Sequence, residues 1–135
     1  MENFRVAVKS FIVDGNKLLL IKRRPNDVHK HGWWDIPGGR LDSGESPFDG
    51  MKREVEEEIG IGIDIIAPLH VQHFTRDDGQ RITMIIFLCK PRNKNIKLSE
   101  EHTEYKWQSL ESDGDVPGWL GDAVSNFRKY YSGKV

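Results

Sequence analysis

The segment from Ser46 to Gly60 carries both a start signal and a stop signal for an α-helix, and it constrains the fold more than any other part of the sequence. Ser46 is a good N-cap residue, and Pro47 suits the first helical position because no N–H donor is needed there. Gly60 is suited to the left-handed conformation that ends many helices. We therefore predict one helix from Pro47 to Gly60.

This predicted helix has an apolar stripe and an acidic stripe beside it. At about 100° per residue, the apolar stripe must face the core. Its members are Phe48, Met51, Val55 and Ile59. Glu54, Glu57 and Glu58 fall together next to it, where their charges repel one another unless a cation lies between them. Oxygen ligands of this kind suit Mg²⁺ or Mn²⁺ and indicate phosphate chemistry.

A solvated acidic face is the alternative explanation for a glutamate-rich helix. Glu56 and Lys52 point away from the three carboxylates, and we expect them to face solvent. The loop before the helix favours a functional site. Gly38-Gly39 and Gly44-Glu45 make it rich in glycine, so its backbone can approach a ligand or a metal closely.

The remaining elements follow from β-prone runs, tight turns and one further apolar periodicity. We expect two hairpins, a short late strand and a second helix that together form an α/β layer architecture with a mixed sheet and helices on its faces. The expected strands cover residues 4–13, 17–23, 65–74, 81–90 and 105–108, and the second helix covers about 117–131.

Composition limits the partners and the setting of the chain. Its 135 residues fit a single domain over residues 1–135, and 20 basic against 21 acidic side chains give a net charge near −1. We therefore expect no long-range attraction to nucleic acid or to anionic lipid. The longest apolar run, Ile82 to Cys89, is far shorter than the roughly 20 residues of a membrane span. With its single cysteine and no visible signal peptide, we expect a cytoplasmic protein, either a monomer or a homodimer.

The motif around the helix resembles the Nudix box at every position. Gly39 is followed after five residues by Glu45 and after seven more by Arg53-Glu54-Val55-Glu56-Glu57-Glu58-Ile59-Gly60-Ile61. The resemblance is MutT-like and extends more weakly from about Val6 to Leu110. It implies an α/β/α sandwich in which the Gly38 carbonyl, Glu54, Glu57 and Glu58 hold the metal. It also implies structural roles for Gly39, Glu45 and Gly60, with Glu45 supporting the loop.

Several roles outside the carboxylate row stay open at this point. Arg53 lies four residues before Glu57, so we expect it to brace that carboxylate. The resemblance suggests that Glu101 is a further metal-binding or basic carboxylate, with Glu100 as its rival, while a polar surface loop is the alternative. It favours Arg24, with Arg23 beside it, as a contact to substrate phosphates; a solvated surface charge is the alternative for each.

The resemblance implies Mg²⁺-dependent hydrolysis of a diphosphate linkage in a small nucleotide. We expect a (d)NTP to yield the (d)NMP and pyrophosphate, with Glu57 or Glu101 accepting the proton from water. The alternatives are an ADP-ribose or nucleotide-sugar pyrophosphatase and a nucleotide sensor without activity. We interpret Trp33, Trp34 and Trp119 as structural first, and His29 is a weaker candidate near the substrate mouth.

Overall fold

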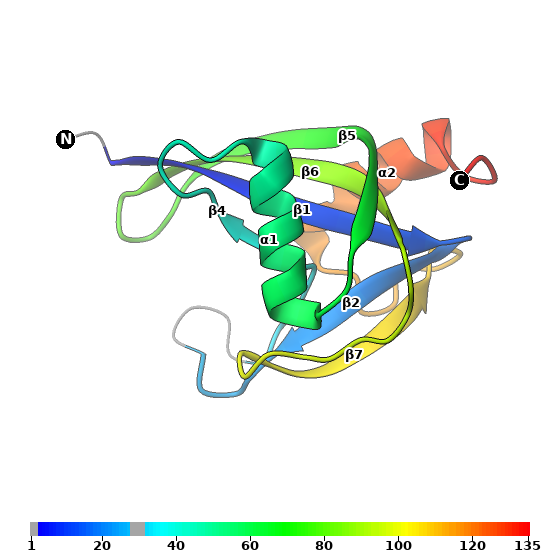
Figure 1. Ribbon diagram of the computed structural model, residues 1–135. Coiled ribbons are helices and arrows are strands. Elements are labelled where there is room, and N and C mark those ends of the chain that lie inside the picture. Colours follow the sequence, from blue (N-terminus) through cyan, green and yellow to red (C-terminus); the bar gives the residue numbers. More distant parts are fainter. Residues whose placement is uncertain (1–2, 28–31) are drawn as a thin grey trace.

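The computed structural model describes residues 3–27 and 32–135. Strand β1 runs through the middle of the molecule, and helix α1 lies across the sheet in front of it (Figure 1). The elements follow one another as β1 (Phe4–Asp14), β2 (Lys17–Arg23), β3 (Trp34–Asp35), β4 (Gly38–Arg40), α1 (Pro47–Ile59), β5 (Ile63–Thr75), β6 (Arg81–Pro91), β7 (His102–Ser109), the 3-10 turn η1 (Gly118–Leu120) and α2 (Gly121–Tyr130).

The sheet is mixed, with strand order β3-β2-β1-β6-β5 among the described residues, while β4 pairs with β1 and β7 pairs with β2. Residues 4–12 of β1 run parallel to residues 81–89 of β6. The last two residues of β1 pair antiparallel with β2 instead. Strand β1 therefore connects the two parts of the sheet, and β4 is attached to it at Lys9 and Gly38, which are paired residues.

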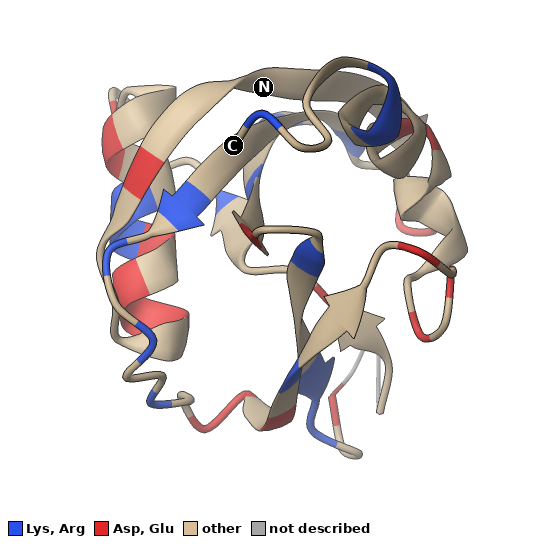
Figure 2. Ribbon diagram, turned by 90° about the vertical axis from the view of Figure 1, so that its right-hand side faces the viewer, with Lys and Arg blue, Asp and Glu red and all other residues tan. Residues whose placement is uncertain are grey.

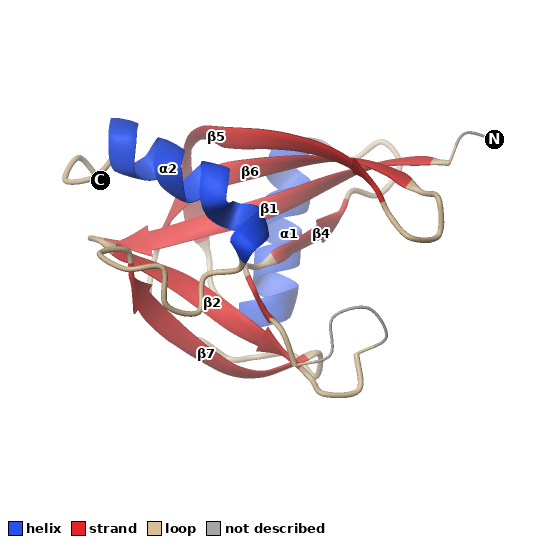
Figure 3. Ribbon diagram, turned by 180° about the vertical axis from the view of Figure 1, so that it is seen from behind, coloured by secondary structure: helices blue, strands red, loops and turns tan. Residues whose placement is uncertain are grey.

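The two helices cover opposite faces of the sheet, as the view from behind shows (Figure 3). Alternation along β1 sends Val8 and Ile12 to the α1 side and Phe11 and Val13 to the α2 side. The α1-side core also contains Leu19, Ile21, Met51, Val55, Ile59, Ile61, Ile63, Phe87 and Cys89. The α2-side core contains Leu18, Leu20, Ile86, Leu88, Leu120, Val124 and Phe127, among others. This arrangement confirms the predicted α/β/α sandwich.

Helix α1 has the ends that its sequence predicts. The Ser46 hydroxyl accepts a hydrogen bond from the Asp49 N–H at 3.1 Å, and Pro47 occupies the first turn. Gly60 adopts the left-handed conformation with φ of 70°, and its N–H donates to the Glu56 carbonyl. The prediction of a buried Phe48 is wrong, because this side chain is 53% exposed. Its ring lies in the first turn, at the edge of the core, where it meets the Phe87 ring at 5.5 Å and keeps its other face toward solvent.

Four other elements differ from the sequence-based expectation. The second helix is shorter, because residues 118–120 form a 3-10 turn before α2 begins at Gly121. The late strand is longer than residues 105–108, since β7 pairs along nearly all of β2. The short strands β3 and β4 were not predicted; only two and three residues long, they have too little sequence for a period-2 pattern.

Across residues 3–27 and 32–135, no helix combines the length and the apolar character that are needed to cross a lipid bilayer.

Candidate active site

Two glycines bring the backbone of β4 close to helix α1. Gly38 has φ of 149°, and a Cβ atom there would lie 2.1 Å from the Val8 carbonyl oxygen. A Cβ atom on Gly39 would lie 2.7 Å from the carboxylate of Glu54. Gly38 therefore requires glycine for steric reasons, because the added atom would meet backbone, whereas a side chain at position 39 would displace the Glu54 carboxylate. The second glycine leaves room for an acidic group directly against the strand.

Glu58 is the most buried carboxylate of the acidic stripe. It is 7% exposed, and its Oε2 accepts a hydrogen bond from the Gly38 N–H at 2.9 Å. Burial raises the pKa of Glu58 to about 8, with a smaller upward contribution from Glu54, although Lys9 and the Gly38 N–H act in the opposite direction. Its negative charge is therefore poorly compensated by the protein alone.

Acidic residues follow one another along helix α1 (Figure 2), and they range from the buried Glu58 to the exposed Glu57. Burial raises the pKa of the partly buried Glu54, against the effect of the neighbouring Arg53. The Glu57 side chain is 59% exposed. Within the described ranges, no three acidic, histidine or cysteine side chains already converge as metal ligands. The donor set nevertheless fits a hard cation, because it combines carboxylate oxygens with a buried acid whose charge lacks full compensation.

Arg53 holds the helix and the preceding loop together. Its Nε and Nη2 donate to the two carboxylate oxygens of Glu45 at 2.7 and 2.9 Å. This bidentate contact lowers the pKa of Glu45 to about 2, and the Asp42 N–H contributes to the same shift. Nη1 of Arg53 also donates to Glu54 at 3.1 Å and to Glu57 at 3.2 Å. The expected contact with Glu57 is therefore present, but Glu45 is the closer partner and accepts two hydrogen bonds.

Gly50 is a position that sequence reasoning missed. It lies inside α1, where glycine is unfavourable, and it is buried. A Cβ atom there would lie 2.3 Å from the Leu41 side chain and 2.9 Å from the Glu45 carboxylate. The absence of a side chain at Gly50 lets the loop pack against the helix. A glycine inside a predicted helix was the sign in the sequence that something packs closely there.

Arg23 and Glu101 lie together at the end of β2. Nη1 of Arg23 is 3.4 Å from Glu101 Oε2, and its Nε is 3.6 Å from Asp35 Oδ2. The Arg24 N–H donates to the Glu101 carbonyl at 2.9 Å. Nε of Arg24 is buried and has no hydrogen-bond acceptor among the described residues. His29 lies outside the described residues.

A buried ion pair that the sequence did not reveal lies beneath these groups. Lys9 is 4% exposed and Asp35 is 1% exposed, and the two side chains are 3.2 Å apart. His102, the residue after Glu101, is also buried. Burial, with Arg23 nearby, lowers the pKa of His102 to about 4. In the sequence, the only sign of the ion pair was Lys9, a lysine within the apolar run of β1.

Two cavities meet at Trp119 on the α2 side of the sheet. One, of about 450 Å³, is lined by Trp33, Trp34, Trp119, Asp115 and Pro117, among others. The other, of about 600 Å³, is lined by residues that include His70, Gln72, Phe74, Met84 and Trp119. Nζ of Lys9 lies 5.9 Å from the centre of the Trp119 ring. The cavities are therefore next to the buried ion pair and offer aromatic surface to a ligand.

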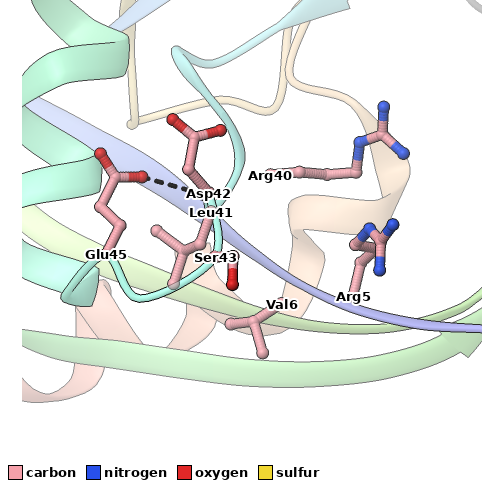
Figure 4. A pocket seen from close by; sticks show the side chains of 7 residues that line it. All are labelled: Arg5, Val6, Arg40, Leu41, Asp42, Ser43 and Glu45. Atoms are coloured by element: carbon pink, nitrogen blue, oxygen red, sulfur yellow. Dashed lines mark hydrogen bonds between the residues drawn. The ribbon is translucent and has the colours of Figure 1, made fainter. Parts of the chain in front are cut away.

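A third cavity, of about 580 Å³, lies beside the glycine-rich loop (Figure 4). Arg5 and Arg40 line one side of it, and the loop residues Asp42 and Glu45 line the other. The Asp42 N–H donates to Glu45 Oε1 at 3.0 Å. This contact fixes the loop next to the first turn of α1.

The model of the NUDIX domain matches residues 3–122. The chain is 34% identical over 103 residues to a MutT-like protein of Streptomyces ambofaciens, which is 76% of this chain and 62% of that protein. It is 40% identical over 78 residues to the 8-oxo-dGTP diphosphatase of Proteus vulgaris, covering 57% of this chain and 68% of that protein. The chain spans less than two thirds of the length of the Streptomyces relative and of three further curated relatives.

A solved structure has the same architecture. The MutT protein from Methanosarcina mazei Go1 superposes with a TM-score of 0.83 at 30% sequence identity, with 95% of each chain covered. The mixed sheet between two helices is thus shared with this protein.

Proposed function

The chain belongs to the Nudix family, and from this premise we propose that it uses Mg²⁺ or Mn²⁺ to hydrolyse a diphosphate linkage in a small nucleotide. One observation carries the proposal. The buried carboxylate of Glu58 lies at hydrogen-bond distance from the Gly38 backbone, beside a second half-buried acid, Glu54. A cation held by these carboxylates would compensate both charges.

The Gly38 carbonyl and the carboxylates of Glu54, Glu57 and Glu58 would hold the cation. When bound, it would neutralise charge on the diphosphate and lower the pKa of water at the site. Arg53 keeps this row oriented through its contacts with Glu54 and Glu57, while Glu45 anchors the guanidinium from the other side. The role of the protein here is positioning, because phosphoryl transfer needs little covalent chemistry from side chains.

The reaction is an in-line attack by water on one phosphorus. The water oxygen forms a bond to that phosphorus while the bridging P–O bond breaks, and the proton passes to a carboxylate. Glu57 suits that role because its side chain is 59% exposed and reaches solvent. Glu101 is the second candidate, since it lies beside Arg23 at the end of β2. Substitution of Glu57 by Gln tests the first candidate.

We propose a nucleoside triphosphate as the substrate, with (d)NMP and pyrophosphate as products. The cavities that meet at Trp119 provide aromatic surface for a base. Arg23 is the last residue of β2 and Arg24 follows it, and both are candidate phosphate contacts. Similarity to a protein named 8-oxo-dGTP diphosphatase supports the same class. The chain is proposed to act as one catalytic unit, in the cytoplasm, as a monomer or a homodimer.

Two alternatives remain within the same fold. Pro68 comes too early after the box for the proline that marks many ADP-ribose hydrolases. A sensor that binds a nucleotide without cleaving it does not need a complete box, and every box position is present here. These observations favour the triphosphate hydrolase.

A panel of (d)NTPs, oxidised (d)NTPs, ADP-ribose and nucleotide sugars tests the proposal. Phosphate and pyrophosphate release are measured with Mg²⁺, with Mn²⁺ and with EDTA. We expect EDTA-sensitive release of pyrophosphate from a nucleoside triphosphate. Cleavage of ADP-ribose or nucleotide sugars alone would replace the substrate class, and metal-dependent binding without turnover would replace the hydrolase by a sensor.

A further inference from the structure

The Lys9–Asp35 ion pair is almost completely buried. Nζ of Lys9 donates to both carboxylate oxygens of Asp35 at 3.2 Å and to the Ile36 carbonyl at 3.2 Å. The two side chains are only 6% and 1% exposed. Taking two charges out of water costs free energy, and a well-packed apolar pair of similar volume is often as stable or more so. Stability alone therefore does not account for this pair.

The pair fixes the segment that leads to the glycines. Asp35 Oδ1 also accepts the Ile36 N–H at 2.8 Å, and the Pro37 carbonyl accepts the Ser10 N–H at 2.7 Å. Residues 35–37 are thus held on β1 by side-chain and backbone contacts in succession. The next residue, Gly38, is paired with Lys9 in the register of β1 and β4.

The same segment ends at the carboxylate row. The Gly38 N–H donates to Glu58 at 2.9 Å, so a shift of residues 35–38 moves the strand away from helix α1. Asp35 also lies 3.6 Å from Nε of Arg23, which in turn contacts Glu101. The buried Asp35 carboxylate therefore links Gly38 and Glu58 on one side to Arg23 and Glu101 on the other.

We propose that the Lys9–Asp35 ion pair is a positioning element that holds Gly38 against helix α1 for the hydrolysis of the diphosphate. This inference rests on the proposed function above. Neither side chain needs to touch the reacting atoms. The pair acts through the backbone of residues 35–38, whose placement decides where the Gly38 carbonyl and the Glu58 carboxylate stand.

Two variants separate positioning from stability. Lys9→Met breaks the pair and leaves Asp35 with less compensation, so we expect a loss of stability in chemical denaturation. Lys9→Met/Asp35→Leu replaces the pair by apolar side chains, so we expect stability to return. In both variants kcat falls by about 10–100-fold, as is typical when groups that orient metal ligands are lost. KM changes less than kcat, because the substrate cavities keep their lining.

The exposed ion pair of Arg92 and Asp64 supplies the matched control. These side chains are 60% and 62% exposed at a separation of 3.0 Å, so Arg92→Met/Asp64→Leu makes the same chemical change far from the buried segment. We expect wild-type kcat for this variant. A Lys9→Met/Asp35→Leu protein with both wild-type stability and wild-type kcat would overturn the inference.

Amide hydrogen exchange at Gly38 provides a readout that needs neither metal nor turnover. In the metal-free wild-type protein, the Gly38 N–H is protected by its bond to Glu58, and we expect faster exchange in Lys9→Met and in Asp35→Asn. Asp35→Asn keeps the shape of the side chain and so covers the case in which the double variant does not fold. Unchanged protection in Asp35→Asn would contradict positioning. If the wild-type protein cleaves no diphosphate, the proposed function fails, while this exchange measurement still decides the role of the pair.

Discussion

The carboxylate of Glu58 accepts a 2.9 Å hydrogen bond from the backbone N–H of Gly38, a residue that lies 20 positions earlier in the chain. This contact joins the last turn of helix α1 to strand β4. It is made in a buried environment, so an ionised Glu58 is costly without a cation nearby. If Glu58 is a metal ligand, as proposed, the metal-free site lowers the stability of the fold.

Removing that charge is expected to stabilise the metal-free protein. Burial raises the folded-state pKa of Glu58 to about 8 from a model-compound value of 4.5. At neutral pH, Glu58→Gln therefore raises the free energy of unfolding, by on the order of a few kcal/mol. Denaturant titration with EDTA measures this, and Glu56→Gln on the exposed face is the control. Turnover is lost in Glu58→Gln. A destabilised Glu58→Gln protein at neutral pH would contradict the assignment of a costly charge.

The same pKa shift predicts how stability depends on pH without metal. Because the folded state binds the Glu58 proton more tightly, its favourable contribution is fully present below pH 4.5 and is lost as the pH rises through about 8. The stability difference between Glu58→Gln and wild type should therefore grow from pH 5 to pH 8. Saturating Mg²⁺ should reduce that growth, since the cation stabilises the ionised carboxylate.

Gly39→Ala is expected to damage the site more than the fold. Its Cβ atom would lie 2.7 Å from the Glu54 carboxylate, which must then move away from β4. We expect kcat to fall by at least about 100-fold, the scale of effect of a misplacement of about 1 Å. Gly121→Ala, where nothing lies within 4 Å of the added Cβ atom, is the control and should keep wild-type kcat. Equal kcat for Gly39→Ala and Gly121→Ala would show that catalysis does not depend on the position of the Glu54 carboxylate.

The contribution of the Glu45–Arg53 contact to stability should depend on pH in the acid range. Arg53 holds the folded-state pKa of Glu45 at about 2, below its usual 4.5, so the stabilising contribution is present above pH 4.5 and is lost as the pH falls through 2. Glu45→Gln should therefore lower the Tm by a constant amount above pH 5, and the difference should shrink toward pH 2. A difference that does not depend on pH would show that the loop is held by packing instead.

Much of the fold follows from local signals in the sequence. Ser46, Pro47 and Gly60 set the ends of α1, and the nearly continuous apolar run from Ile82 to Cys89 is typical of a strand that is covered on both faces. The exposure of Phe48 was not predictable, because helical spacing gives the direction of a side chain but not where the sheet below it ends. Helix spacing also placed Arg53 near Glu57, which the structure shows at 3.2 Å.

The contacts between distant residues were beyond sequence reasoning. The ion pair of Lys9 and Asp35 joins strands β1 and β3, 26 residues apart, and neither residue belongs to the motif. The same holds for the cavities at Trp119, which depend on how η1 packs against the sheet. Local patterns predict the motif, whereas these contacts depend on tertiary pairing.

The most direct test of the account compares Glu57→Gln with Glu56→Gln in the release of pyrophosphate from a nucleoside triphosphate with Mg²⁺. The two side chains are adjacent and exposed, but only Glu57 belongs to the acidic stripe that contacts Arg53. We predict that Glu57→Gln loses at least about 100-fold in kcat with an unchanged Tm, and that Glu56→Gln keeps the wild-type rate. Equal rates for the two variants would contradict the claim that this face of α1 carries the chemistry.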